Sequence, residues 1–437
     1  MVLGGGAVPA VRVYDPGMIR ALGMAMAVTW AVSAPSAWAQ EQRWSCRVLP
    51  AEHEVLVEPD TGAKVVFATT HPGTDRNLYF HDRSWLSDGS LAVFYSDRGG
   101  RQTLYGYAEA TGNLVELIPE GQPPAGSVTC SRRGNRIYGV CDGAACAWAV
   151  ACRFEPELRV EVRRRRIAEL PRNGGLTSSL NENADGRLLS VSFVDADAPG
   201  VYHIAVIEVQ TGRITPVARV DFPVSHVQFS WTRPDLLMFA RTYPQGDRMP
   251  PASGPSPVAG APGHVVGTQP APAPHYRIWL VDLSGKPPWP IYPQVPDELV
   301  THECWWTEER LTFCGGHHVP DESHVKVFDL KTGRISIIGA GSWWPAASQR
   351  QITRRSWWHA AGSPDGRWVV ADNFHGDIVL FDALTTRERP LTTGHRKLGQ
   401  PHHPHPGWAE SSDRVVFTSN RRGNPDLAIV YVPAGWR

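Results

Sequence analysis

Residues 356–373 read SWWHAAGSPDGRWVVADN, and residues 376–392 continue as GDIVLFDALTTRERPLT. The first stretch holds an aromatic entry segment with His359, the turn Asp365-Gly366 and then a run rich in Val. A D-G turn between two such runs predicts a β-hairpin, and the second stretch adds two further strands around a polar turn. Together these residues predict a four-stranded antiparallel meander.

The same phrase recurs along the chain at intervals of roughly 45–75 residues, which is typical of a repeat architecture. It appears in residues 77–118, 224–292, 300–339 and 401–432, and it is least clear in residues 119–217. One meander cannot bury both of its faces alone, so neighbouring meanders must stack. The sequence therefore predicts an all-β fold, a β-propeller with seven blades of four antiparallel strands each. A pair of β-sandwiches is the structural alternative.

Composition agrees with this fold and excludes some partners. The 437 residues include 17 Trp, 41 Gly and 38 Pro, a profile that suits short strands, tight turns and aromatic packing. Lys+Arg and Asp+Glu balance at 43 each. No overall field exists to recruit nucleic acid or an anionic membrane, so neither is expected as a partner.

The first 39 residues have the features of a secretory signal peptide. Arg20 precedes an apolar run at residues 21–32, and Ala37-Trp38-Ala39 precedes Gln40. A positive start, an apolar centre too short to span a bilayer and an A-x-A site are the marks of such a signal. We expect a periplasmic or secreted protein with no membrane attachment after cleavage.

Residues 40–437 are then expected to form a single propeller domain. Its main interruption is a Pro/Gly-rich insertion at about residues 243–274, interpreted as a flexible surface loop between two strands of one blade. The four arginines at 163–166 are predicted to lie on a solvated edge strand.

Seven cysteines are compatible with an oxidising compartment. Cys304 and Cys314 lie across an expected hairpin, and either a disulfide between them or free buried thiols fits the sequence. The spacing of Cys141, Cys146 and Cys152 matches no common zinc pattern.

Histidines mark the strands that are expected to line the central channel. The first strand of each propeller blade lies at the channel, and its opening residues meet at one mouth. Four successive blades open with histidine at His226, His302, His359 and the pair His403 and His405. A single histidine at such a place is usually a polar rim residue, whereas four blades supplying the same residue indicate a shared site.

The stretch GQPHHPHPGW at residues 399–408 has a specific geometry. His403 and His405 are two apart and face the same way on an extended strand, while His402 faces the other way. Pro404 and Pro406 cannot donate ladder hydrogen bonds, so one side of this strand must be unpaired. A solvated loop is the alternative interpretation of so polar a stretch.

Gln400 lies close enough to His403 and His405 to add an amide oxygen. With His359 from the adjacent blade, the set becomes three imidazole nitrogens and one amide oxygen. Imidazoles suit divalent transition metals, and an amide oxygen with open positions suits a harder ion such as manganese. The spacing leaves a metal site and a metal-free polar mouth both open. The sequence contains no G-x-S-x-G elbow, P-loop or dinucleotide fingerprint.

At these residues the chain resembles the oligogalacturonate lyase family of polysaccharide lyases. The stretch at 399–408 followed by DRVVFTSNRRGN carries the resemblance, with SHVQFSWTRPD, RIWLVDLSG, THECWW and NLYF, over about residues 55–432. The resemblance implies a seven-bladed propeller with a divalent metal, usually manganese, held by three His and one Gln. The implied metal ligands are His359, Gln400, His403 and His405.

The resemblance also implies a reaction. His302 matches the family's proposed catalytic histidine and Arg277 its catalytic arginine. The expected activity is cleavage of galacturonides or related uronides by metal-assisted β-elimination, which yields 4,5-unsaturated products. The chain departs from the family in its signal peptide, in the stretch around His359 and in the insertion before Arg277. A non-enzymatic periplasmic propeller of the TolB type, binding proteins, is the alternative function.

Overall fold

The computed structural model describes residues 41–171, 175–243, 275–319, 321–344, 346–396 and 402–436. The predicted signal peptide and most of the Pro/Gly-rich insertion lie outside these residues, so both remain predictions. Among the described residues, no helix has the length and apolar character needed to cross a bilayer.

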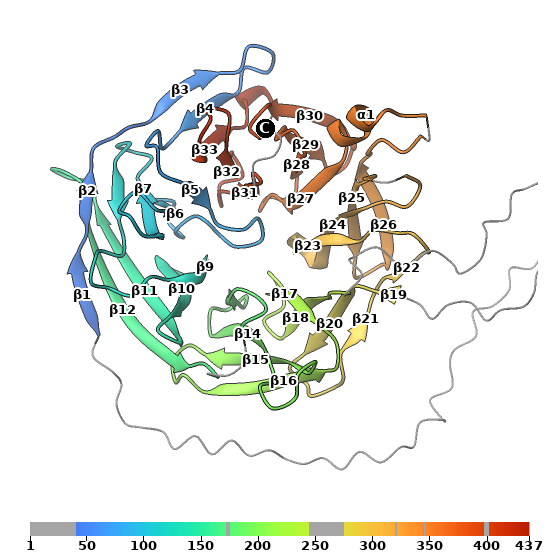
Figure 1. Cartoon of the computed structure of the whole chain (residues 1–437), viewed down its shortest axis with the longest axis horizontal. Coiled ribbons are helices and arrows are strands. Elements are labelled where there is room, and N and C mark those ends of the chain that lie inside the picture. The colour runs from blue at the N-terminus through green and yellow to red at the C-terminus, as the bar shows by residue number, and fades with distance from the viewer. Residues whose placement is uncertain are drawn as a thin grey trace, which may run out of the picture. The chain divides into compact units, whose positions relative to one another are not determined.

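Seven small antiparallel sheets stand around a central axis, which confirms the predicted seven-bladed β-propeller (Figure 1). Each blade is numbered here in chain order, and its strands are given from the axis outward. Blades 1 to 3 consist of β5 (Asp75–Asn77), β6 (Ala92–Ser96), β7 (Thr103–Tyr107) and β8 (Leu114–Glu116); β9 (Gly126–Cys130), β10 (Arg136–Cys141), β11 (Ala144–Arg153) and β12 (Arg159–Glu169); and β13 (Asn181–Glu182), β14 (Leu188–Val194), β15 (Tyr202–Glu208) and β16 (Ile214–Val220).

Blades 4 to 7 complete the ring. Their strands are β17 (Val224–Phe229), β18 (Leu236–Arg241), β20 (Ile278–Asp282) and β21 (Trp289–Pro290); β23 (Thr301–Trp305), β24 (Arg310–Gly315), β25 (His324–Asp329) and β26 (Arg334–Gly339); β27 (Trp357–Gly362), β28 (Trp368–Asn373), β29 (Ile378–Asp382) and β30 (Glu388–Thr392); and β31 (Gly407–Trp408), β32 (Arg414–Ser419), β33 (Asp426–Tyr431) and β4 (Lys64–Phe67). The pair β19 (His275–Tyr276) and β22 (Pro293–Gln294), helix α1 (Gln349–Arg354) and the 3-10 turns η1 (Thr307–Glu309) and η2 (Ala434–Trp436) lie outside the blades.

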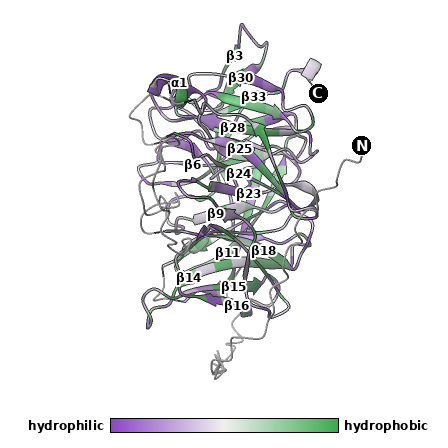
Figure 2. Ribbon diagram, turned by 90° about the vertical axis from the view of Figure 1, so that its right-hand side faces the viewer, coloured by the Kyte–Doolittle hydropathy of each residue, from purple (hydrophilic) through white to green (hydrophobic). Residues whose placement is uncertain are grey.

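The hydrophobic core is divided among the interfaces between blades. Val415 and Phe417 pack toward blade 6, whereas Val416 between them packs toward blade 1. This alternation is the period of two that a strand buried on both faces requires. In Figure 2 the hydrophobic colour runs through middle strands such as β18 and β33. The predicted stacking of meanders therefore provides the burial that no single blade achieves.

The N-terminal strands close the ring and add to three blades. β4 pairs with β33, so the two ends of the propeller share blade 7. β1 (Gln42–Ser45), β2 (Arg47–Leu49) and β3 (Glu54–Val57) then form fifth, outermost strands on blades 2, 1 and 7 (Figure 1). The prediction of four strands holds for the other four blades only. The predicted edge position is wrong for Arg163 and Arg164, because β1 pairs with β12 from Glu161 to Arg164, and Arg164 is 8% exposed. Arg165 and Arg166 have no partner in β1.

All seven cysteines are free thiols in the structure. Cys304 and Cys314 lie on neighbouring strands, but Cys314 stands opposite Thr301, and Cys304 stands opposite Thr312. This register separates the two sulfurs, so the free-thiol alternative holds for them. The only sulfur pair in contact among the described residues is Cys141 and Cys146, at 2.6 Å across the β10–β11 hairpin.

A β-bulge interrupts the innermost strand of several blades at the same place. In β17, β23 and β27 two residues of the inner strand stand opposite one residue of the next strand, and the first bulged residues are His226, His302 and His359. Their φ angles are 50°, 55° and 44°, and His405, just before β31, has φ 49°. A bulge turns its residue away from the pleat. The bulges thereby turn His226, His302 and His359 toward the axis, and His405 shares their left-handed φ outside any of these bulges.

Candidate metal centre

Four imidazole rings from blades 5, 6 and 7 gather at the axis. The His359 centroid lies 4.2 Å from that of His302, 4.3 Å from that of His405 and 5.4 Å from that of His403. His403 and His405 stack at 5.8 Å, as expected for residues two apart on an extended segment. These four residues are termed the histidine cluster. The structure brings together four of the predicted site residues, whereas Gln400 lies outside the described residues.

The centre of this cluster offers a set of possible metal ligands. Ligand atoms of His359, His403 and Asp372 all lie within 4.8 Å of one another. Imidazole nitrogens combined with a carboxylate oxygen suit divalent transition metals, including manganese. The ring of His405 lies beside that of His359, although no nitrogen of His405 belongs to this group of ligand atoms.

Asp372 is a member of the site that the sequence patterns did not single out. It stands opposite Trp358 in the pairing of β27 with β28, and it is 1% exposed. Its Oδ1 lies 2.8 Å from Nδ1 of His359. A carboxylate that accepts from Nδ1 fixes the tautomer and leaves Nε2 of the imidazole for a metal.

The second carboxylate oxygen supports the same interpretation. Oδ2 of Asp372 is buried and has no hydrogen-bond partner among the described residues. A buried acceptor without a partner is costly, and a cation is the group that would satisfy it. Burial raises the pKa of Asp372 to about 6. A bound cation would favour the ionised form of this carboxyl group.

Burial keeps the histidine cluster uncharged. It lowers the pKa of His359 to about 3 and that of His403 to about 4. It also holds the pKa values of His302 and His405 well below the usual range. The nearby charge of Arg396 lowers the pKa of His359 and His403 further. Neutral imidazole is the form that binds a metal or accepts a proton.

His302 stands at the side of the cluster. Its Nδ1 is buried and has no hydrogen-bond partner among the described residues. The indole of Trp358 meets the imidazole edge-on, with the ring centroids 5.1 Å apart. A neutral imidazole beside the ligand set has the position and the protonation state of a general base.

Arg277 forms a buried ion pair with Glu303 next to the cluster. It precedes β20 and is 2% exposed, and both its Nε and its Nη2 donate to the carboxylate of Glu303. Oε2 of Glu303 is also 2.8 Å from Nδ1 of His226. Burial acts to raise the pKa of Glu303, but the charge of Arg277 and the contact with His226 hold it below its usual value. Arg277 thus reaches the cluster through Glu303 and His226, whose ring lies 6.4 Å from that of His302.

Blade 1 supplies the floor of the site. Here the inner strand leaves the sheet after β5 and extends into the centre of the ring (Figure 1). The Tyr79 ring lies 4.7 Å from His405 and 6.0 Å from His359, and the Phe80 ring lies 5.5 Å from His359 and 5.9 Å from His302. These aromatic rings therefore pack against one side of the cluster. The stretch NLYF at residues 77–80 was noted in the sequence, but nothing there indicated that Tyr79 and Phe80 would pack against the histidines.

No protein-family model matches the chain, and no curated protein sequence matches it. Among solved structures, the oligogalacturonate lyase of Vibrio parahaemolyticus aligns with a TM-score of 0.67 and 17% identity, over 90% of this chain and 100% of that chain. The chain has the fold of oligogalacturonate lyases.

Two further solved structures show equal or lower structural similarity to the chain. An oligogalacturonate lyase in complex with manganese aligns with a TM-score of 0.67 and 16% identity, over 90% of this chain and 99% of that chain. A putative TolB from Agrobacterium tumefaciens aligns with a TM-score of 0.35 and 14% identity, over 59% and 73%. The predicted resemblance to oligogalacturonate lyases is confirmed for the fold.

Proposed function

We propose that the protein is a metal-dependent lyase that cleaves oligogalacturonides or related uronides by β-elimination. The observation that carries the proposal is the histidine cluster with Asp372, which gathers neutral imidazoles and a partnerless carboxylate oxygen at one point. The shared fold with two oligogalacturonate lyases, one of them a manganese complex, supports the choice of reaction.

The ligand set would be His359, His403, His405 and Asp372, with Gln400 as a further predicted ligand. A divalent metal held there, most simply manganese, supplies electrostatic stabilisation for the charge that builds on the uronate carboxylate during proton loss. The rest of the chemistry belongs to the side chains.

His302 is the proposed general base. Its neutral imidazole accepts the proton from C5 of the uronate, and the electron pair of that bond forms the C4–C5 double bond. The C4–O4 bond breaks, and the departing O4 takes up a proton from solvent. Tyr79 and Phe80 keep water away from one side of this step, which strengthens each electrostatic contact.

Arg277 is proposed to assist in holding the uronate carboxylate. Because Nε and Nη2 of this buried arginine donate to Glu303, it would act on the carboxylate through its charge and by positioning Glu303 and His226 beside His302. The pair with Glu303 compensates part of its charge, so its contribution is smaller than that of the ligand set.

The test is an absorbance assay on purified protein with manganese and oligogalacturonides, which detects the unsaturated product in the ultraviolet. We expect product from the wild type and none from His302→Ala, although that variant should still contain metal by elemental analysis. His402→Ala is the matched control, since His402 is a neighbouring histidine outside the proposed site. A metal-loaded wild type that forms no product from any oligouronide would refute the proposal.

A further inference from the structure

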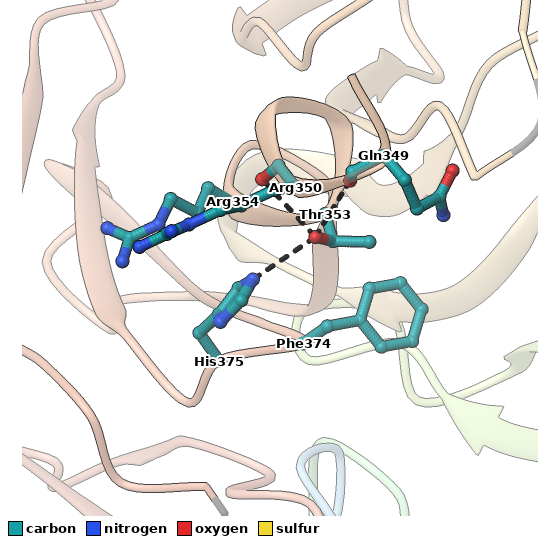
Figure 3. Close-up of a pocket in the computed structure, with 6 residues that line it drawn as sticks. All are labelled: Gln349, Arg350, Thr353, Arg354, Phe374 and His375. Carbon is teal, nitrogen blue, oxygen red and sulfur yellow. Dashed lines mark hydrogen bonds between the residues drawn. The ribbon is translucent and has the colours of Figure 1, made fainter. Parts of the chain in front are cut away.

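A cavity opens at the same end of blade 6 as the histidine cluster. It has a volume of about 560 Å³ and is lined by Gln349, Arg350, Thr353, Arg354, Phe374 and His375 (Figure 3). Helix α1 leads directly into β27, and Phe374 and His375 follow β28, which runs antiparallel to β27. Both walls therefore belong to the mouth at which β27 begins. The volume lies within the usual range of small-molecule sites.

The cavity carries two cations from one helix face. Arg350 and Arg354 are four residues apart and therefore neighbours on α1. Both are exposed, and neither forms a salt bridge with any residue that the structure describes. Burial lowers the pKa of His375, with Arg354 and Arg350 acting in the same direction and Asp377 against them. Asp377 is itself engaged by Asn373 and by the backbone of Gly394.

Aromatic contacts connect the cavity to the histidine cluster. The Phe374 ring meets Trp358 edge-on at 5.2 Å, and Trp358 in turn meets His302 at 5.1 Å. The guanidinium carbon of Arg396 lies 5.9 Å from the Phe374 ring centroid, and the same charge acts on His359. The cavity and the proposed base thus lie on opposite sides of one indole.

The cavity is preorganised by hydrogen bonds. The Thr353 hydroxyl lies 3.1 Å from Nε2 of His375 and donates to the carbonyl oxygen of Gln349 at 3.0 Å (Figure 3). Nδ2 of Asn373 donates to the carbonyl oxygen of Arg354 at 2.9 Å, which ties α1 to the other wall. Ser348 begins the helix with a capping box. A site that is already formed loses little entropy when it binds a ligand.

We propose that this cavity is a carboxylate-binding subsite for a second uronate of the substrate chain, with Arg350 and Arg354 as its cations and Phe374 as its apolar wall. This inference rests on the proposed function, because it assumes that the sugar at His302 is part of an acidic oligomer. Such an oligomer carries one carboxylate on each ring, and Arg is the side chain best suited to meet it. The subsite makes the protein selective for oligomers over single uronates.

The experiment measures binding in a His302→Ala background, so that the ligand stays intact. Calorimetry would compare galacturonate monomer, galacturonate tetramer and fully methyl-esterified tetramer with the manganese-loaded protein. We expect the acidic tetramer to bind more tightly than the other two. Arg350→Gln with Arg354→Gln should weaken tetramer binding by at least about tenfold and leave monomer binding unchanged.

Two controls separate charge from folding. Arg350→Lys with Arg354→Lys keeps the charges and should restore part of the affinity. Arg387→Gln removes an exposed arginine from the turn between β29 and β30, at the other end of the blade, and should bind as the parent does.

The outcomes separate this inference from the proposed function. Equal tetramer affinity with and without the two arginines, or no preference of the parent for the acidic tetramer, overturns the subsite. Length-dependent binding that needs both arginines, with no unsaturated product from the wild type, supports the subsite and refutes the lyase.

Discussion

Blades 2 and 5 have the same β-bulge in their inner strands but differ in the side chain at its first residue. In β9, Ser127 and Val128 stand opposite Gly139 alone, just as His302 and Glu303 in β23 stand opposite Phe313. The φ angles are 51° at Ser127 and 55° at His302. The bulge therefore recurs in the inner strands of blades 2, 4, 5 and 6, and its first residue is a histidine in blades 4, 5 and 6 but a serine in blade 2.

Blade 1 extends the comparison. At the same position its inner strand leaves the sheet and inserts Tyr79 and Phe80 among the histidines. Blades 5 to 7 thus supply the proposed ligands and the proposed base, whereas blade 2 supplies a serine bulge and blade 1 two aromatic rings. The difference teaches that the chemistry depends on residue identity at positions that the fold has already aimed at the axis.

The largest expected effect is a loss of manganese affinity when one of the proposed ligands is removed. His403→Ala should weaken manganese binding by at least about a hundredfold, since one of the few coordinating nitrogens is lost. Titration calorimetry with manganese would measure this. His402→Ala is the matched control and should bind manganese as the wild type does. Equal affinities for the two variants would contradict the ligand assignment.

The second largest effect is expected from Asp372, the residue of β28 that contacts His359. Asp372→Asn keeps the shape but removes the negative charge beside His359. We expect manganese affinity to fall about 10- to 100-fold, as is usual when a carboxylate partner of a ligand is lost. Competition with a chelator would measure the change. An unchanged affinity would remove Asp372 from the centre.

A third prediction concerns the acid stability of the protein and the buried side chain of His395. His395, after β30, is fully buried between Thr392 and Ser419, and burial lowers its pKa to about 3. The unfolded histidine titrates near 6.5, so below that pH only the unfolded state gains the proton. His395 alone should therefore lower the free energy of unfolding by up to about 1.4 kcal/mol per pH unit as pH drops from about 6 to 4, in addition to what the buried histidines of the cluster contribute.

Urea denaturation of metal-free protein at several pH values would measure this slope. His395→Asn should show a shallower pH dependence than the wild type, because the titrating group is gone. His53→Asn, at an exposed histidine outside the ring, should keep the full slope. A variant at His395 with the wild-type slope would show that other groups cause the acid lability.

The smallest effect compares the two bulges directly. Ser127→Gly relieves a left-handed backbone conformation and should raise the free energy of unfolding by about 0.5–1 kcal/mol. Its lyase activity should remain. His302→Gly relieves the same strain but loses contacts with His359 and Trp358, and activity should disappear. Thermal melts and the absorbance assay would be read together, and destabilisation by Ser127→Gly would contradict the view that this bulge is strained.

Much of this arrangement was predictable because it repeats. The turn at Asp365-Gly366 and the alternation around it indicate a hairpin, and several copies of the phrase indicate a propeller. His302, His359, His403 and His405 were candidates because each opens an inner strand. Asp372 was missed, since a single aspartate in a middle strand has no spacing that distinguishes it from a buried polar residue.

The N-terminal strands were missed for a different reason. β1, β2 and β3 lie outside the repeat, and their partners β12, β8 and β4 are contributed by three separate blades. Their pairing depends on where the closed ring brings those outer edges. For the same reason Arg163 and Arg164 of β12 were misplaced on an edge that β1 in fact covers.

By itself the sequence determined the strand period, the turns and the residue types, because these act over neighbouring positions in the chain. It thereby determined the seven-bladed fold and the histidines that face the axis. Only the tertiary structure decided which side chains meet there. His359 meets Asp372 and Phe80, and Arg277 meets Glu303. The proximity of these segments depends on the closure of the ring and on the bulges in the inner strands. Local pattern carries no information about such distances, and the chemistry depends on them.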